Sequence, residues 1–269
     1  MKTYLSIDRG ASNTDFVLVD SNYKIITKKC INTRDWNCII NTYNKMIEEA
    51  TPDFFIFTGS ANNMPLELKD KFFLADEIES IAFGGAYAAS REKCIVISMG
   101  TGTAVVLFDH GKAEHIGGTG VGGGTMLGLG KLLTGEINPK KLNKLSSKGN
   151  PANLNLILSE IGYSKVGILD SNLTVSNFGN LKSNNENDKA AAIECMIAEV
   201  IGVIASLTAK LYQMENDIII IGNLSGSTFI REQLKKVGKL YKTTFTFPEN
   251  PEYLTAIGAV ESFRENQNK

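Results

Sequence analysis

The stretch GGTGVGGGTMLGLG, residues 117–130, decides how the rest of the chain is interpreted. Glycine loses more conformational freedom on folding than any other residue, so a loop this rich in glycine is costly to order. Flexible linkers are Gly/Ser mixtures between polar segments, whereas apolar residues flank this stretch on both sides. We therefore expect Gly120 to Thr125 to form a turn that leads into a helix, with Gly128 and Gly130 allowing close packing.

The composition is that of a globular protein with a sizeable core. Of the 269 residues, 43% are hydrophobic and 21% are charged. Lysine and arginine total 28 against 29 acidic residues, so no net positive field favours a nucleic acid or an anionic membrane as a partner. The chain reaches Asp8 before any stretch of signal-peptide length, and no apolar run approaches the ~20 residues that span a bilayer. We expect a cytoplasmic protein.

Two similar segments open two halves of the chain. Residues 3–20 (TYLSIDRGASNTDFVLVD) and 94–109 (CIVISMGTGTAVVLFD) each join two apolar strands through a Gly/Ser/Thr turn. This repeat predicts two related halves that each begin with a β-hairpin. Helical segments between the strands favour an α/β architecture. We place the boundary near residue 92, which gives domains at 1–92 and 93–269.

Four polar glycine turns follow a predicted strand or precede a predicted helix. They span Asp8–Thr14, Ser98–Thr103, Gly117–Thr125 and Gly222–Ser227. Such turns expose successive backbone N–H groups and can bind phosphate oxygens together with a helix N-terminus. A Rossmann site is not expected, although 118–123 fits GxGxxG, because the strands before it look antiparallel. The four turns together predict a site for nucleotide phosphates between two lobes.

Several motifs resemble those of a known family. They are ISMGTGTAVV, HIGGTGVGGGTMLGLGKLLTG, LTVSNFGN with the following KAAAI, IIIIGNLSG, and LTAIGA near the end. The arrangement resembles the type II pantothenate kinases, within the sugar kinase, Hsp70 and actin superfamily. The resemblance implies a two-lobed actin-like ATPase fold built from two ribonuclease-H-like domains with mixed sheets. It also implies transfer of phosphate from ATP to a primary hydroxyl, a role in coenzyme A biosynthesis, and usually a homodimer.

The resemblance assigns roles to particular residues. Asp8 matches the acidic residue that positions Mg²⁺, and Glu77 matches the catalytic glutamate that takes the proton from the attacking hydroxyl. Magnesium needs only one or two carboxylates beside phosphate oxygens and water, and a carboxylate that opens a helix after a strand suits general-base work. The positions expected to bind ATP are Gly10, Ser12, Asn13, Thr101, Gly102, Thr103, Gly122, Gly123, Gly124, Thr125, Gly222, Asn223 and Gly226. The positions expected to bind the substrate are Ala104, His115, Gly117 and Gly118.

Three positions depart from the family pattern. Asp15 stands where a lysine is common, Ala104 stands in place of a serine that contacts the substrate, and His115 stands in place of an arginine. Arginine is always charged and can bind a carboxylate through two hydrogen bonds, whereas an unperturbed histidine is mostly neutral at pH 7. We therefore expect the acceptor to be pantothenate or a relative without its carboxylate, such as pantetheine.

Other readings stay open at this point. The same fold serves activators of 2-hydroxyacyl-CoA dehydratases and N-acetylglucosamine-kinase-like enzymes, and DRGASNTD also resembles the phosphate hairpin of the latter. A protein that binds a nucleotide, CoA or an acyl-CoA without catalysis is a further alternative. The four cysteines show no spacing typical of a metal or iron–sulfur site.

Overall fold

The computed structural model describes residues 2–32, 35–162, 165–166 and 169–267. The chain forms two compact units, which are treated separately. Unit 1 contains Met1–Gly118, Ile219–Asn223 and Thr246–Lys269, and unit 2 contains Thr119–Ile218 and Leu224–Phe245. The predicted lobe boundary near residue 92 falls inside unit 1 and stays a prediction.

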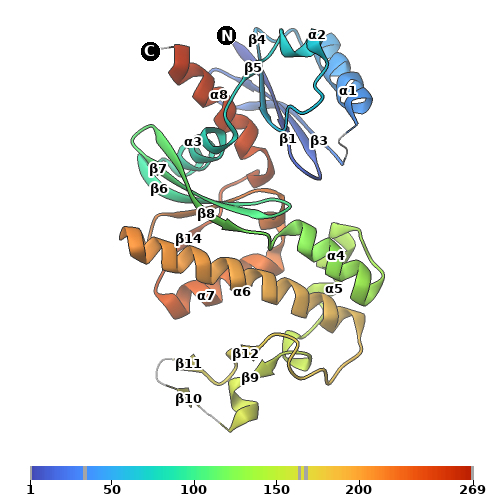
Figure 1. Cartoon of the computed structure of the whole chain (residues 1–269), viewed down its shortest axis with the longest axis vertical. Coiled ribbons are helices and arrows are strands. Elements are labelled where there is room, and N and C mark those ends of the chain that lie inside the picture. Colours follow the sequence, from blue (N-terminus) through green and yellow to red (C-terminus); the bar gives the residue numbers. More distant parts are fainter. Residues whose placement is uncertain (1, 33–34, 163–164, 167–168, 268–269) are drawn as a thin grey trace. The chain divides into compact units, whose positions relative to one another are not determined.

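Unit 1 holds two five-stranded sheets and the helices packed on them (Figure 1). The elements of the first sheet and its helices are β1 (Thr3–Arg9), β2 (Thr14–Asp20), β3 (Ile25–Ile31), α1 (Trp36–Glu49), β4 (Phe54–Gly59), α2 (Leu66–Lys69), β5 (Phe73–Leu74) and α3 (Glu77–Ala89). The second sheet is formed by β6 (Lys93–Met99), β7 (Thr103–Asp109), β8 (Lys112–Thr119), β13 (Ile218–Ile221) and β14 (Phe245–Thr246). The short helix η4 (Pro251–Tyr253) and α8 (Leu254–Gln267) complete the unit.

The two sheets share one strand order. The first runs β3-β2-β1-β4-β5 and the second runs β8-β7-β6-β13-β14 when read from the corresponding edge. In both sheets the first two strands in sequence form an antiparallel hairpin, β1 with β2 and β6 with β7. The repeat seen in the sequence is therefore a repeat of structure, with two mixed α/β halves.

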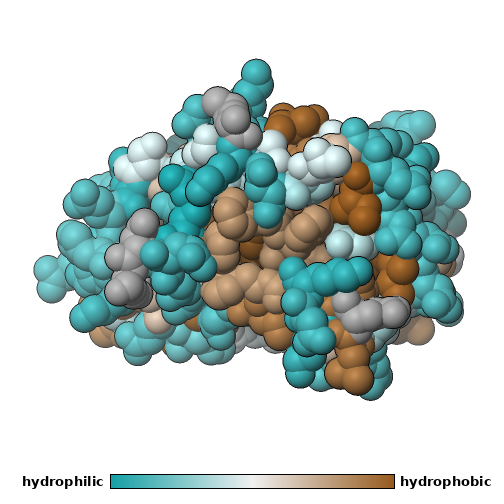
Figure 2. Space-filling model, turned by 90° about the horizontal axis from the view of Figure 1, so that it is seen from above, coloured by the Kyte–Doolittle hydropathy of each residue, from teal (hydrophilic) through white to brown (hydrophobic). Residues whose placement is uncertain are grey.

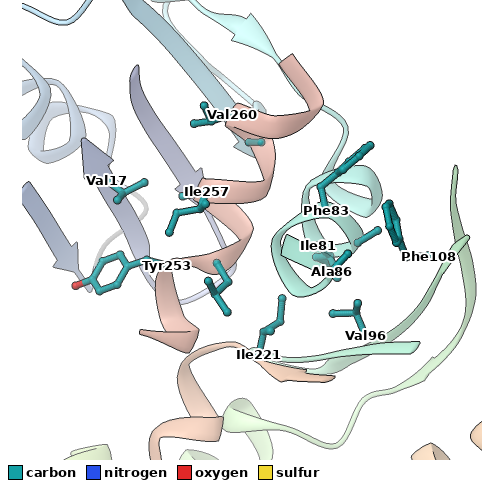
Figure 3. Packing of buried hydrophobic residues seen from close by; sticks show 14 of the residues in the cluster. Val17, Ile81, Phe83, Ala86, Val96, Phe108, Ile221, Tyr253, Ile257 and Val260 are labelled. Atoms are coloured by element: carbon teal, nitrogen blue, oxygen red, sulfur yellow. The ribbon is translucent and has the colours of Figure 1, made fainter. Parts of the chain in front are cut away.

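Helices α3 and α8 fill the layer between the two sheets. A single apolar cluster joins Val17 of β2 to Ile257 and Val260 of α8, and Ile81 of α3 to Val96 of β6 (Figure 3). The opposite face of the first sheet packs on α1 through a second cluster. Alternate residues of each strand point to opposite faces of the sheet. Because both faces of β1 and β2 are covered by helices, both sets of residues are apolar.

The two central helices touch at glycine. A Cβ atom on Gly84 would lie 2.0 Å from the Leu254 carbonyl oxygen, and one on Gly258 would lie 2.0 Å from that of Ser80. Both distances are shorter than any van der Waals contact, so a methyl group at either position would push the helices apart. Gly258 is the glycine of the LTAIGA segment.

Unit 2 is mainly helical, as the sequence predicts. Its helices are α4 (Gly123–Thr134), α5 (Pro139–Ser146), α6 (Glu186–Tyr212) and α7 (Thr228–Tyr241). Its smaller elements are η1 (Pro151–Asn153), β9 (Leu156–Ile157), η2 (Leu158–Ile161), β10 (Lys165–Val166), β11 (Leu169–Asp170), β12 (Thr174–Ser176) and η3 (Asn223–Gly226), the last of which begins at the end of unit 1. The short strands and α7 were not predicted.

A buried carboxylate ties three of these helices together. Glu194 of α6 is 1% exposed and accepts hydrogen bonds from the Ser146 hydroxyl, at 2.9 Å, and the Ser227 hydroxyl, at 2.7 Å. Ser146 ends α5, and Ser227 caps α7 by accepting from the Ile230 N–H. The two hydroxyls satisfy a charge that would otherwise be costly to bury.

Helix α6 corrects one expectation. It is long and apolar enough to span a membrane by length and composition, contrary to the expectation that no such run exists. However, 67% of its most apolar window is buried inside the protein, against α4, α5 and α7. Core helices that are apolar all round have this character, so α6 is a core helix of unit 2.

One face of the molecule carries exposed apolar surface. Figure 2, seen from above Figure 1, shows apolar side chains gathered in the middle of this face among hydrophilic ones. The exposed large hydrophobic residues of unit 1 include Ile26, Leu66 and Leu74. Contiguous apolar surface is typical of interaction sites. The homodimer implied by the family resemblance stays a prediction.

The glycine contact between α3 and α8 generates a stability prediction. We expect Gly258→Ala to lower the free energy of unfolding by about 3 kcal/mol, because the added methyl overlaps backbone atoms that cannot move aside. Gly128→Ala is the matched control, since Gly128 is exposed in α4 and its Cβ would meet nothing within 4 Å. The control should gain about 0.5–1 kcal/mol of helix propensity. Urea unfolding measures both, and equal stability of Gly258→Ala and wild type would contradict the packing.

Candidate active site

A row of polar residues crosses the first sheet where β1 ends. Asp8 of β1 lies directly opposite Asp15 of β2 on one side and Thr58 of β4 on the other, and Asp15 is paired in turn with Cys30 of β3. Residues in register across a sheet project from the same face. Tyr4 and Val17, also on this face, pack in the cluster with α3 and α8. The row therefore continues the buried layer at its polar end.

Asp15 is a buried acid with one satisfied oxygen. Its side chain is 3% exposed, and its Oδ2 accepts a hydrogen bond of 3.2 Å from the Asn223 amide. Within the described part of the chain, Asp15 Oδ1 has no hydrogen-bond partner. Burial raises the pKa of Asp15 to about 6, and Glu252 adds to this effect, whereas hydrogen bonds from Cys30 and Asn223 oppose it.

Two other acids raise the pKa of Asp8. Burial raises the pKa of Asp8 well above its ordinary range, and the charges of Asp15 and Glu77 raise it further. Gly59, the last residue of β4, has φ +80°, and a Cβ atom there would lie 3.0 Å from Asp8 Oδ1. Glycine is therefore needed beside this carboxylate, both for the backbone conformation and for space.

Glu77 is held at the first turn of α3. Asp76 caps the helix by accepting from the Glu79 N–H at 3.0 Å, and the Ser80 hydroxyl donates to the Asp76 carbonyl at 2.6 Å. The Thr58 hydroxyl donates to Ser80 at 3.0 Å, which ties the helix start to β4. Burial and the neighbouring Asp76 raise the pKa of Glu77. A fixed carboxylate of raised pKa has the character of a general base.

The two hairpin turns meet each other. The hydroxyl groups of Ser12, in the first turn, and Thr101, in the second, lie 2.9 Å apart and share a hydrogen bond. The structure thus brings together the two predicted phosphate turns, with Gly10 and Asn13 in one and Gly102 and Thr103 in the other. Their contact with a nucleotide stays a prediction.

The predicted adenosine turn reaches the same place. Gly222 has φ +93°, and a Cβ atom there would lie 2.7 Å from the Met99 carbonyl oxygen at the end of β6. Its N–H donates to the Pro251 carbonyl at 2.9 Å. The next residue, Asn223, is the one that donates to Asp15. Gly226 ends η3 and belongs to unit 2.

Contacts within unit 1 bring together two of the four predicted substrate positions, Gly118 and Ala104. A Cβ atom on Gly118 would lie 2.6 Å from the Thr103 carbonyl oxygen and 3.6 Å from the Ala104 Cα, so Gly118 and Ala104 are neighbours. His115 is exposed on β8, and a Cβ atom on Gly117 would meet nothing within 4 Å. A substrate role for these four residues stays a prediction.

The glycine loop leads into a helix, as the sequence predicts. Helix α4 begins at Gly123, with Gly122 as its N-cap, so the second half of the expected turn at Gly120 to Thr125 already belongs to the helix. The Thr125 hydroxyl donates to the Gly120 carbonyl at 3.1 Å and accepts from the Gly122 N–H at 3.3 Å, which closes the turn. The first N–H groups of a helix have no intrahelical partner and suit anions. Phosphate binding by Gly122, Gly123, Gly124 and Thr125 stays a prediction.

The prediction of close packing at Gly128 and Gly130 is confirmed for one of the two glycines. A Cβ atom on Gly130 would lie 2.7 Å from a methyl carbon of Leu142 in α5, so this glycine does allow a close approach. Gly128 is exposed and faces open space, so the expectation for Gly128 was wrong.

Sequence reasoning missed the hydrogen bond between Asp15 and Asn223. The two residues are 208 positions apart, and no local pattern connects them. The pairing of Asp8 with Asp15 did have a signal, because the predicted turn at Asp8–Thr14 between two strands fixes the register of the hairpin. Asp15 therefore does not only replace a lysine of the family pattern. It also belongs to the row of polar residues that crosses the first sheet.

Comparisons with known proteins show the family to which this chain belongs. The Fumble family model matches residues 19–262. The chain belongs to the Fumble family. A type II pantothenate kinase of Bacillus thuringiensis is 26% identical to this Fumble-family chain over 273 residues, covering 97% of each. One from Oceanobacillus iheyensis is 28% identical over 218 residues, covering 78% of this chain and 81% of the relative.

Solved structures share the fold. Component A of the Acidaminococcus fermentans (R)-2-hydroxyglutaryl-CoA dehydratase matches with a TM-score of 0.67 at 14% identity, covering 99% of this chain and 100% of the other. A ROK family glucokinase from Streptomyces griseus, in complex with glucose and AMPPNP, matches with a TM-score of 0.64 at 12% identity, covering 98% and 99%. The predicted fold class, a two-lobed actin-like ATPase fold with mixed sheets, is confirmed for this member of the Fumble family.

The buried acid gives a pH prediction. A pKa of about 6 in place of the ordinary 3.8 means that, between about pH 4 and pH 6, folded Asp15 keeps a proton that the unfolded chain has lost. Stability therefore falls as pH rises through this window. We expect Asp15→Asn, which keeps an acceptor for Asn223, to flatten the fall and to raise stability at about pH 7 by up to roughly 3 kcal/mol.

The matched control for this measurement is Asp109→Asn. Asp109 is partly exposed, and hydrogen bonds from Lys93 and His110 lower its pKa, so its charge does not oppose folding near neutral pH. Urea unfolding at a series of pH values distinguishes the two variants. An Asp15→Asn variant as sensitive to pH as the wild type, and no more stable at about pH 7, would contradict the burial of a charged Asp15.

Proposed function

We propose that this Fumble-family chain is an ATP- and Mg²⁺-dependent kinase that phosphorylates a primary hydroxyl of pantothenate or of a carboxylate-free relative such as pantetheine. The observation that carries the proposal is that the turns of Ser12 and Thr101 are joined by a hydrogen bond directly after β1 and β6, while Glu77 lies near enough to Asp8 to raise its pKa. The relatives named type II pantothenate kinase, which align over nearly the whole chain, support the same reaction.

The residues of unit 1 supply the groups that phosphoryl transfer to an alcohol needs. Glu77 accepts the proton of the attacking hydroxyl, and its partial burial strengthens it as a base. The acceptor oxygen then forms a bond to the γ-phosphorus of ATP while the bond to the β,γ-bridging oxygen breaks, and ADP leaves. Such transfer depends on positioning and charge stabilisation, and the two hairpin turns offer backbone N–H groups to the phosphates.

A divalent cation fits the donor set of the hairpin. Asp8 and Asp15 supply two carboxylates, and Asp15 Oδ1 is a buried oxygen that makes no hydrogen bond to any described residue. The described residues contain no group of three or more His, Cys, Asp or Glu side chains placed to hold a metal without other ligands. Mg²⁺ usually binds through one or two carboxylates together with phosphate oxygens and water. When bound, the cation would neutralise charge on the phosphates.

The departures at Ala104 and His115 favour an acceptor without a carboxylate. Ala104 has no side-chain hydrogen-bond donor, and His115 is exposed on β8. Neither residue gives the fixed, doubly donating cation that arginine offers a carboxylate. Pantetheine has a primary hydroxyl and no carboxylate, which makes it the first acceptor to test.

The assembly and setting follow from the same proposal. We propose a homodimer in the cytoplasm, acting on a small alcohol in coenzyme A biosynthesis, with CoA or an acyl-CoA as a further ligand. The near balance of acidic and basic residues supports a small-molecule partner over a nucleic acid.

The test is ADP release from ATP and Mg²⁺ against a panel of pantothenate, pantetheine and amino sugars. We expect turnover that depends on the acceptor and falls by at least about 10²-fold in Glu77→Gln, the lower end of general-base contributions. Glu79→Gln is the matched control. Glu79 lies on the same helix and accepts a hydrogen bond of 2.8 Å from Ser262, which glutamine can still accept.

Each other outcome selects a different reading. Efficient phosphorylation of pantothenate with pantetheine ignored would reject the carboxylate-free acceptor. Turnover with amino sugars alone would select the N-acetylglucosamine-kinase-like alternative. ATP hydrolysis that no acceptor stimulates would select an activator-type ATPase, and nucleotide binding without any turnover would select a non-catalytic binding protein.

A further inference from the structure

The hairpin site gathers three acidic side chains and no basic one among the described residues that interact with them. Asp8, Asp15 and Glu77 lie close enough for both Asp15 and Glu77 to act on Asp8. Of the residues that the structure describes, none forms an ion pair with any of these three acids. The site must therefore acquire positive charge before it can hold a polyphosphate.

The cation nearest in sequence is engaged elsewhere. Arg9 follows Asp8 in β1, so its side chain leaves the opposite face of the sheet. Its guanidinium donates to the Ser60 carbonyl at 2.8 Å and lies over the Trp36 ring at 4.5 Å. Arg9 thus fastens the loop after β4 to α1 and does not replace the lysine that related hairpins carry.

Asp15 has the features of an incomplete ligand. One oxygen accepts from Asn223, which fixes the orientation of the carboxylate, and the other is buried and receives no hydrogen bond from a described residue. Buried oxygens are nearly always satisfied, because desolvation without a partner is costly. Its cross-strand neighbour is Asp8, and directly opposed residues have Cβ atoms about 4.5–5.5 Å apart. Two carboxylates at this spacing can share one cation.

We propose that Asp15 is a second ligand, beside Asp8, for the divalent cation that accompanies the nucleotide, bound directly or through one water. Nucleotide binding at this hairpin then requires the cation. Without it, the two carboxylates would repel the phosphates, and no lysine at position 15 would offset this repulsion. The inference rests on the proposed function only in requiring that a nucleotide binds at the hairpins. It requires no particular acceptor.

The first test measures metal binding without turnover. Electron paramagnetic resonance of free Mn²⁺ reports its affinity for the full chain in the presence of AMPPNP. We expect Asp15→Asn to weaken Mn²⁺ binding at least about tenfold, the lower range for losing a metal-supporting residue. Asp70→Asn, at an exposed acid outside the site, removes the same charge and should leave Mn²⁺ affinity unchanged. An Asp15→Asn variant within twofold of wild type would overturn the proposal.

The second test restores the lysine. Calorimetry of AMPPNP binding in excess EDTA should show that Asp15→Lys binds the metal-free nucleotide at least about tenfold more tightly than the wild type does, because the added cation takes over the charge compensation. Equal, weak binding by both would count against the proposal. If Asp15→Lys does not fold, as judged by circular dichroism, the Asp15→Asn result decides alone. Absence of kinase activity with every acceptor would reject the proposed function but leave these binding results unaffected.

Discussion

The close crossing of α3 and α8 is the constraint on which the site depends. Gly84 and Gly258 let the two backbones touch, so one thin layer of helix fits between two sheets. Helix α3 begins at Glu77, and the hydrogen bond from Thr58 to Ser80 sets that beginning against β4. On the α8 side, the Pro251 carbonyl just before the helix accepts the Gly222 N–H. The packing that fills the core thereby brings the catalytic candidates to one edge.

That edge concentrates like charges at a cost to stability. Burial raises the pKa values of Asp8, Asp15 and Glu77, and nearby acids add to the effect: Asp15 and Glu77 at Asp8, Glu252 at Asp15, and Asp76 at Glu77. Groups with perturbed pKa values gather at functional sites because the chemistry requires charges in positions that folding alone would not favour. The acids differ in their surroundings: Glu77 sits at a helix start, whereas Asp8 and Asp15 face each other across a hairpin. In the proposed function, this difference in surroundings distinguishes the base, Glu77, from the two carboxylates proposed to bind the cation.

Sequence patterns predicted the parts of the fold that are set locally. Apolar strands around Gly/Ser/Thr turns gave both hairpins, and Asp76, a good N-cap, marks the start of α3. The bond from Asn223 to Asp15 depends on how distant segments meet, so no local signal gives it. Helix α7 was missed although Ile230, Leu234 and Val237 follow a helical spacing. The composition of α6 fits a membrane span as well as a core helix, and only its packing inside unit 2 distinguishes the two.

Anomalous scattering from Mn²⁺ in crystals grown with AMPPNP would locate the cation and the triphosphate in one experiment. We expect a manganese peak beside the carboxylates of Asp8 and Asp15, coordinated directly or through one water, with the γ-phosphate turned toward Glu77. A well-occupied manganese and triphosphate bound away from this pair of carboxylates would contradict this expectation.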